Sequence, residues 1–190
     1  KQPSEFIPRS RTEYLTINQA VDQHAIKNAL ALLVAAKNPC IIAGSGVLTS
    51  NAYDSLEKFA NRSGIPVATT PKAKGVFPEN HLLSLGVLGL SGHAHAESYF
   101  NSPLLDALLV IGSSLGETVT YNWRKNLSVP IIHIDIDPQE IGKNFPVTIG
   151  IVGDARSILN EALIELEKSF PEGLKHNSNP LLTLKESIPR

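Results

Sequence analysis

The chain has 190 residues, a formal net charge of −1 and 42% hydrophobic residues, which suits one globular domain and gives no electrostatic signature of binding to nucleic acid or an anionic membrane. No apolar run reaches the roughly 18 residues of a membrane-spanning helix, and no signal peptide is visible. The single cysteine, Cys40, excludes an intrachain disulfide and a paired-cysteine metal site, so we expect a cytoplasmic protein.

The ends of the chain differ in composition from its middle. The chain begins at Lys1 and contains no methionine, so we expect it to be a piece of a longer protein. Residues 1–16 and 171–190 carry several prolines among polar residues, as linkers do. The predicted domain therefore spans residues 17–170, although frayed termini would have the same composition.

Hydrophobic periodicity in the first half predicts helices at 18–37 and 50–63, with Asn18 as candidate N-cap of the first and Gly64 ending the second. Short apolar runs predict strands at 39–43, 65–69 and 82–85. The residues expected to face inward are Ala25, Leu30, Leu33 and Val34 in the first helix, and Leu56, Phe59 and Ala60 in the second.

The second half continues the alternation. It predicts a helix at 92–100, strands at 105–111, 131–136 and 147–152, a short helix or turn at 118–126, and an amphipathic helix at 155–169 whose inward residues are Ile158, Leu159, Ala162, Leu163 and Leu166. Strands that alternate with helices imply a parallel sheet covered on both faces. The predicted fold class is therefore α/β, a three-layer α/β/α arrangement that right-handed crossovers make doubly wound and Rossmann-like.

The most informative run extends over residues 131–144. It opens as a strand that is apolar apart from His133, and it places Asp135 and Asp137 at and just beyond the strand's carboxyl end. Pro138 is expected to begin a new element, since its fixed φ suits the first turn of a helix. Ligands of open α/β sheets lie outside the carboxyl ends of the strands. A carboxylate there can accept hydrogen bonds from a ribose hydroxyl or an adenine amine.

Two further loops offer ligand contacts. Asp154 follows the last predicted strand and can hold an adenosine group together with Asp135, or it can simply cap the following helix. Gly44-Ser45-Gly46 follows a strand and precedes a helix, so its amides can bind phosphate. Position 49 is threonine, so the full glycine-rich dinucleotide motif is absent, and a tight turn without a ligand explains these glycines equally well.

Other reactive side chains favour structural roles, and no catalytic or metal-ligating residue is predicted. His93 and His95 are two positions apart and would face different ways on a helix, which argues against a shared metal. No serine lies in a nucleophile elbow. Cys40 lies within a strand and is interpreted as buried packing. Lys72 and Lys74 can contact a phosphate or lie on a solvated loop.

Three segments, in this order and spacing, resemble the central domain of thiamine-diphosphate-dependent enzymes, especially of the acetolactate synthase branch. They are residues 69–81 (TTPKAKGVFPENH) with the LGVLG that follows at 85–89, residues 131–144 (IIHIDIDPQEIGKN) and residues 151–155 (IVGDA). The resemblance covers roughly residues 18–168. It implies a six-stranded parallel sheet of order 3-2-1-4-5-6, which reverses between the first and fourth strands.

The resemblance also implies a cofactor crevice. In the acetolactate synthase branch the central domain binds FAD with little or no redox role, whereas other branches bind ADP or nothing there. Carried over by position, the binding residues are Gly44, Ser45, Gly46, Thr69, Thr70, Leu88, Gly89, Gly112 and Ser113, with Asp135, Ile136, Asp154 and Ala155 at the adenine end.

One segment departs from the FAD-binding pattern. Where FAD-binding members read G-A-R-F-D-D-R-V-T, residues 112–120 read GSSLGETVT, so Ser114 and Thr118 replace two arginines. Each missing charge-assisted hydrogen bond is worth about 1.5–3 kcal/mol. We therefore expect weak ADP binding at most, and FAD binding no better than ADP.

The resemblance further implies partner domains outside this chain. An N-terminal domain would supply the glutamate that activates the thiamine ring, and a C-terminal domain would hold thiamine diphosphate and magnesium through a G-D-G motif. The only Gly-Asp pair here, Gly153-Asp154, is followed by alanine. The chain alone is therefore expected to lack the residues for carbon–carbon bond chemistry.

The predicted role is to join the pyrimidine- and diphosphate-binding domains of a 2-oxo acid decarboxylase or carboligase and to help assemble a homo-oligomer. The alternative is a self-standing nucleotide-binding module of FAD or NAD type. A third interpretation, a sirtuin-like deacylase, usually requires four zinc cysteines, and the chain has one.

Overall fold

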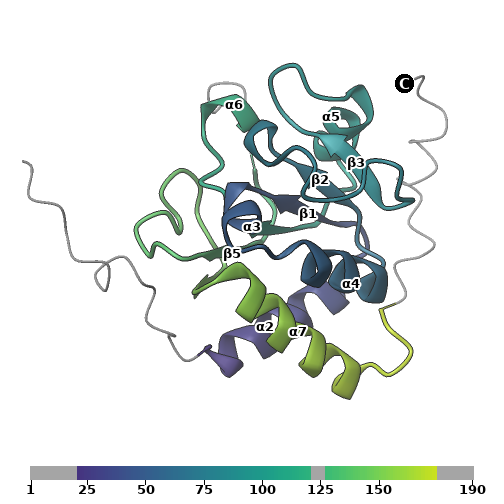
Figure 1. The fold of residues 1–190 in the computed structure, drawn as a ribbon, viewed down its shortest axis with the longest axis vertical. Coiled ribbons are helices and arrows are strands. Elements are labelled where there is room, and N and C mark those ends of the chain that lie inside the picture. The colour runs from purple at the N-terminus through teal and green to yellow at the C-terminus, as the bar shows by residue number, and fades with distance from the viewer. Residues whose placement is uncertain (1–20, 121–126, 175–190) are drawn as a thin grey trace, which may run out of the picture.

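One parallel sheet organises the domain (Figure 1), and the computed structural model describes residues 21–120 and 127–174 of the chain. The strand order is β3-β2-β1-β4-β5-β6, and each strand pairs in parallel with its neighbours. The predicted fold class and the strand order are confirmed. The strands are β1 (Pro39–Ala43), β2 (Val67–Thr69), β3 (Ser84–Val87), β4 (Ala107–Ile111), β5 (Ile131–Asp135) and β6 (Ile149–Val152).

Helices cover both faces of the sheet because successive strand residues point to opposite sides. In β1, Ile41 belongs to the core beneath α2 (Gln23–Ala35), α4 (Tyr53–Ser63) and α7 (Ala155–Ser169), which lie on one side of the sheet (Figure 1). The next residue, Ile42, belongs to a second core with residues of α5 (Ala94–Phe100) and α6 (Glu117–Thr120). The sheet and the helices on its two faces are the three layers that the sequence predicts, and one core lies on each face of the sheet.

The first described helix begins later than predicted. Its N-cap is Asp22, whose carboxylate accepts hydrogen bonds from the amides of His24 and Ala25, each at 3.0 Å. Asn18, the predicted cap, lies outside the described residues. Val34 was expected to face inward but is 38% exposed. The buried stripe instead contains Ile26, Ala29, Leu30 and Leu33, which follow the three- and four-residue spacing of one helix face.

Two further predictions about elements need correction. The helix expected at 50–63 begins three residues later, as α4, and the short helix α3 (Ser45–Thr49) that precedes it was not predicted. Asn51, between the two helices, has a left-handed φ of 52°. Pro138 begins no helix. The chain turns there instead, and Asp137 stabilises the turn by accepting hydrogen bonds from the amides of Gln139 and Glu140. Residues 121–126 of the predicted 118–126 element lie outside the described residues.

The end of α7 is tied to α4 through Arg62. The guanidinium of Arg62 donates to the carbonyl oxygens of Phe170, at 3.1 Å, and Pro171. The amide of Leu174, a buried residue, donates to the Arg62 carbonyl at 3.3 Å. Residues 171–174 therefore pack on the domain, while the linker assignment of 1–16 and 171–190 stays a prediction.

Candidate functional site

The carboxyl ends of the strands meet at one edge, where backbone hydrogen bonds join consecutive loops. Gly44, Gly112 and Gly153 directly follow β1, β4 and β6, so all three lie at this edge. The bonds that cross it run from Leu88 to Thr69 (2.8 Å), Thr70 to Ala43 (2.9 Å), Gly112 to Ile134 (2.8 Å) and Gly153 to Asp135 (2.9 Å), amide to carbonyl in each case. The predicted binding residues are thus brought to one edge of the sheet.

The glycine loops after β1 and β4 pack directly against each other. The amide of Gly44 donates to the carbonyl of Ile111 at 2.8 Å, and the amide of Gly46 donates to that of Gly112 at 3.0 Å. A Cβ at Gly44 would lie 2.2 Å from the Gly112 oxygen, and a Cβ at Gly112 would lie 2.4 Å from the Cα of Gly46. Contact between two loops therefore explains these glycines without a ligand.

The same contact limits what the Gly44-Ser45-Gly46 loop can bind. Its Gly46 amide is engaged with Gly112, and the Val47 amide donates to the Gly44 carbonyl at 3.0 Å. The helix that follows, α3, has only five residues. The fit to a phosphate is poor at this loop, because two of the amides that would bind it already have partners.

The middle of the predicted crevice is largely covered. Thr69, Thr70, Leu88 and Gly89 are all buried. A Cβ at Gly89 would lie 2.2 Å from the carbonyl oxygen of Thr118, so the loop after β3 packs closely on α6. These four residues therefore support the edge from within the domain and expose little surface to a ligand.

The adenine end offers more accessible acceptors. Asp154 caps α7, and its Oδ1 accepts hydrogen bonds from the amide (2.9 Å) and hydroxyl (3.1 Å) of Ser157, so the capping interpretation is confirmed. The Oδ1 of Asp135 accepts from the amide of Asp137 at 3.0 Å. The second oxygen of each carboxylate makes no hydrogen bond to the residues that the structure describes. Ile136 lies beside them and is 49% exposed, whereas Ala155 is buried.

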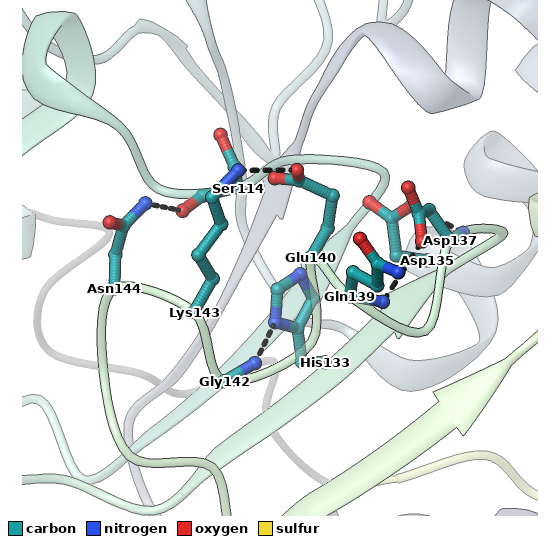
Figure 2. A network of polar contacts seen from close by, with 9 residues as sticks. All are labelled: Ser114, His133, Asp135, Asp137, Gln139, Glu140, Gly142, Lys143 and Asn144. Carbon is teal, nitrogen blue, oxygen red and sulfur yellow. Dashed lines mark hydrogen bonds and ion pairs between the residues drawn. The ribbon is translucent and has the colours of Figure 1, made fainter.

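A turn over residues 137–144 borders this end of the edge (Figure 2). Asn144 donates from Nδ2 to the Ser114 carbonyl at 2.7 Å. Lys143 and Glu140 form an ion pair at 2.6 Å, which raises the pKa of the Lys143 ammonium. No role was predicted for these residues, because nothing in their spacing shows that the turn folds back on the loop after β4.

His133 lies beneath that turn and is 3% exposed. Its Nδ1 accepts a hydrogen bond from the Gly142 amide at 3.4 Å, and its Nε2 makes no hydrogen bond among the described residues. Burial lowers the pKa of the imidazole, and the opposing effects of Asp135, the Ser113 backbone and Glu140 are smaller. One signal pointed to this residue, a histidine in an otherwise apolar strand.

The pair His93 and His95 differs from its predicted geometry. His93 is the extended N-cap of α5 rather than a helical residue, so the two rings stack with centroids 5.4 Å apart. The Nδ1 of His93 accepts a hydrogen bond from the Val87 amide at 2.8 Å.

Within residues 21–120 and 127–174, no group of three or more histidines, cysteines and acidic residues is placed to hold a metal ion. The helices of these ranges are also too short or too polar to cross a bilayer.

Similarity to known proteins identifies the domain. The sequence matches the family described as thiamine pyrophosphate enzyme, central domain, over residues 26–162. The chain belongs to this family. The match runs from α2 into α7, so it includes the whole sheet of this central domain, and the resemblance inferred from three segments is confirmed.

The relatives are acetolactate synthases. The central domain is 41% identical over 155 residues to the probable acetolactate synthase large subunit of Methanococcus aeolicus, covering 81% of this chain and 26% of the relative. It is 44% identical over 146 residues to the protein of that description from Methanocaldococcus jannaschii, covering 75% and 24%. It is 38% identical over 168 residues to the acetolactate synthase large subunit of Corynebacterium glutamicum, covering 87% and 26%. The chain spans about a quarter of the length of these relatives.

We predict that Gly112→Ala destabilises this central domain far more than Gly75→Ala. Both glycines have a left-handed φ, at +59° and +89°, but nothing lies within 4 Å of a Cβ at Gly75. The conformational cost of about 1 kcal/mol is common to both variants. Steric overlap adds about 1–3 kcal/mol at Gly112 alone. Urea denaturation measures both changes, and equal losses would contradict the loop contact.

We predict that Cys40 does not react with thiol reagents in the folded domain. Burial raises the pKa of its thiol to about 12. At about pH 8 only roughly one thiol in ten thousand is then ionised, and the thiolate is the reactive form. Absorbance with a chromogenic disulfide should show no reaction until urea unfolds the chain, and rapid labelling of the folded protein would contradict this.

Proposed function

We propose that this chain acts as the central domain of a thiamine-diphosphate-dependent enzyme that decarboxylates or ligates 2-oxo acids. Family membership over residues 26–162 and similarity to proteins named acetolactate synthase support this proposal. The chemistry would belong to partner domains that bind the pyrimidine and the diphosphate of the cofactor, the latter with magnesium. The central domain would connect them and contribute to a homo-oligomer, in the cytoplasm.

The observation that carries this connecting role is the closed contact between the loops after β1 and β4. Ligands of doubly wound sheets commonly enter where the strand order reverses. Here Gly46 and Gly112 are in contact at that point, and their backbones are hydrogen-bonded. Such an edge favours rigidity over ligand exchange, which suits a domain that holds others in place.

A second role, weak binding of an adenine nucleotide, is favoured by the acceptors at the other end of the edge. Asp135 and Asp154 each leave one carboxylate oxygen without a hydrogen-bond partner among the described residues, and Ile136, next to Asp135 in the chain, is half exposed. Hydroxyl and amine protons of adenosine suit such acceptors. ADP or FAD would be the ligand. Its phosphates would lie toward Gly44 and Ser113, where two loop amides are already engaged, and we therefore propose only weak binding.

The alternative, a self-standing module of FAD or NAD type, receives less support. Its motif would place a third glycine at position 49, where the chain has threonine. Family membership also favours a domain that works within a larger enzyme.

We predict that the chain alone neither binds thiamine diphosphate tightly nor decarboxylates 2-oxo acids. Its only Gly-Asp pair, Gly153-Asp154, is engaged in capping α7 and is followed by alanine. Calorimetry with thiamine diphosphate and magnesium should show no binding in the micromolar range, and a measurable micromolar dissociation constant would overturn the prediction.

We predict that the purified chain is colourless, binds ADP weakly at most, and binds FAD no more tightly than ADP. Ser114 and Thr118 supply no charge for the rest of a dinucleotide, and Lys74 lies 3.9 Å from Glu79 rather than being unpaired. Asp135→Ala should abolish the ADP binding that exists, whereas Glu167→Ala, at an exposed position near the end of α7 opposite Asp154, should leave it unchanged. Calorimetry and visible absorbance measure these properties.

Either of two results would contradict this prediction. Flavin absorbance near stoichiometry would show that other groups replace the missing arginines. Unchanged ADP binding in Asp135→Ala, with the fold verified by circular dichroism, would remove the proposed adenosine contact.

A further inference from the structure

The turn at residues 137–144 is attached at four places to β5, β6 and the loop after β4, as far as the described residues show (Figure 2). The first is the bond from the Asp137 amide to the Asp135 carboxylate at 3.0 Å. Ile141 packs on β6 where Gly150 has no side chain, since a Cβ there would lie 2.7 Å from Ile141 Cγ2. Asn144 donates to the Ser114 carbonyl, and Gly142 donates to the His133 imidazole. Of these four attachments, only the bond to His133 involves a group that titrates near neutral pH.

The bond from Gly142 requires one state of the imidazole. A backbone N–H can donate only to a ring nitrogen that carries no proton, so Nδ1 must be bare and the ring neutral with its proton on Nε2. Gly142 reaches this position through a left-handed φ of 74°. A proton added at Nδ1 would point at the Gly142 N–H, and the contact would become repulsive.

We propose that His133 is a proton-operated latch, which holds the 137–144 turn against the sheet while neutral and releases it on protonation. The turn would swing away from β5, so that water reaches the ring and solvates its charge. Asp137, whose amide donates to the Asp135 carboxylate, would move with the turn. The proposal is independent of nucleotide binding, because it concerns only contacts within the chain.

The direction of the pH effect follows from burial. Burial lowers the pKa of His133 in the closed turn below its ordinary value of 6.5, and an opened, hydrated ring would return toward that value. The open state therefore binds the proton more readily. The closed turn keeps its full stability above pH 6.5 and loses it progressively as the pH falls from 6.5 toward the lowered pKa.

Among the described residues, few charges face the ring to oppose this release. Its cross-strand neighbours are Val110 and Gly150, which carry none. Asp135, on its own strand, and Glu140, in the turn, would attract a protonated ring, but Glu140 is already paired with Lys143. Burial outweighs both carboxylates in its effect on the pKa of His133.

Hydrogen exchange measured by NMR tests the latch in the 190-residue chain. The protection factor of the Gly142 amide should be constant above pH 6.5 and should fall by up to about tenfold per pH unit below it, until the lowered pKa is reached. The amides of β4 should keep their protection throughout. Nitrogen chemical shifts should show the His133 ring protonated on Nε2 at neutral pH and titrating with a midpoint below 6.5.

Two variants separate this mechanism from general acid unfolding. His133→Gln keeps an oxygen acceptor for Gly142 but cannot titrate, so its protection should no longer depend on pH. His93→Gln is the matched control, because His93 also accepts a backbone amide on Nδ1, and it should behave like the unmodified chain.

Four results would overturn the latch. They are pH-independent protection of Gly142, loss of protection that includes β4, a pH response that persists in His133→Gln, and a pH response that disappears in His93→Gln. Should His133→Gln fail to fold, the ring titration decides the question in the unmodified chain. Titration of His133 without loss of protection at Gly142 would refute the proposal.

Discussion

The contact between the glycine loops after β1 and β4 is the constraint on which the carboxyl edge depends. β1 and β4 are the central pair of the sheet, and their ends approach so closely that Gly44, Gly46 and Gly112 have no room for side chains. Hydrogen bonds then extend from this pair outward, to the end of β2 on one side and of β5 on the other. A side chain at the centre would displace both halves of the edge.

This constraint divides the edge into two unlike halves. At the centre, backbone amides and carbonyls form hydrogen bonds with one another, so few amides remain to bind a phosphate. Toward β6, Asp135 and Asp154 are tied down through one oxygen each, and the 137–144 turn stands beside them. Rigidity at the centre and partly exposed polar groups at one side suit the proposed connecting role and the proposed weak binding of a nucleotide.

Particular residues show how far the sequence predicts this arrangement. An apolar run followed by glycine located the ends of β1 and β4 correctly, because a buried parallel strand is apolar throughout and needs a tight turn at its end. Capping was one of the two roles predicted for Asp154 from its position before a helix, and the structure confirms it. The predictions that Val34 faces inward and that Pro138 begins a helix were wrong. The inward face of a helix and the path of the chain after a strand both depend on what the segment packs against. No feature of the sequence indicated the hydrogen bond between Gly142 and His133.

The sequence by itself determined the class of fold, the alternation of strands and helices, and membership of a family whose domains share this sheet. Those features follow from local spacing and from ordered motifs, which are written along the chain. Only the tertiary structure decided that Gly46 meets Gly112, that Asn144 reaches Ser114, and that the His133 imidazole must stay neutral to accept the Gly142 amide. Each depends on which segments the folded sheet places side by side, and spacing along the chain does not specify that.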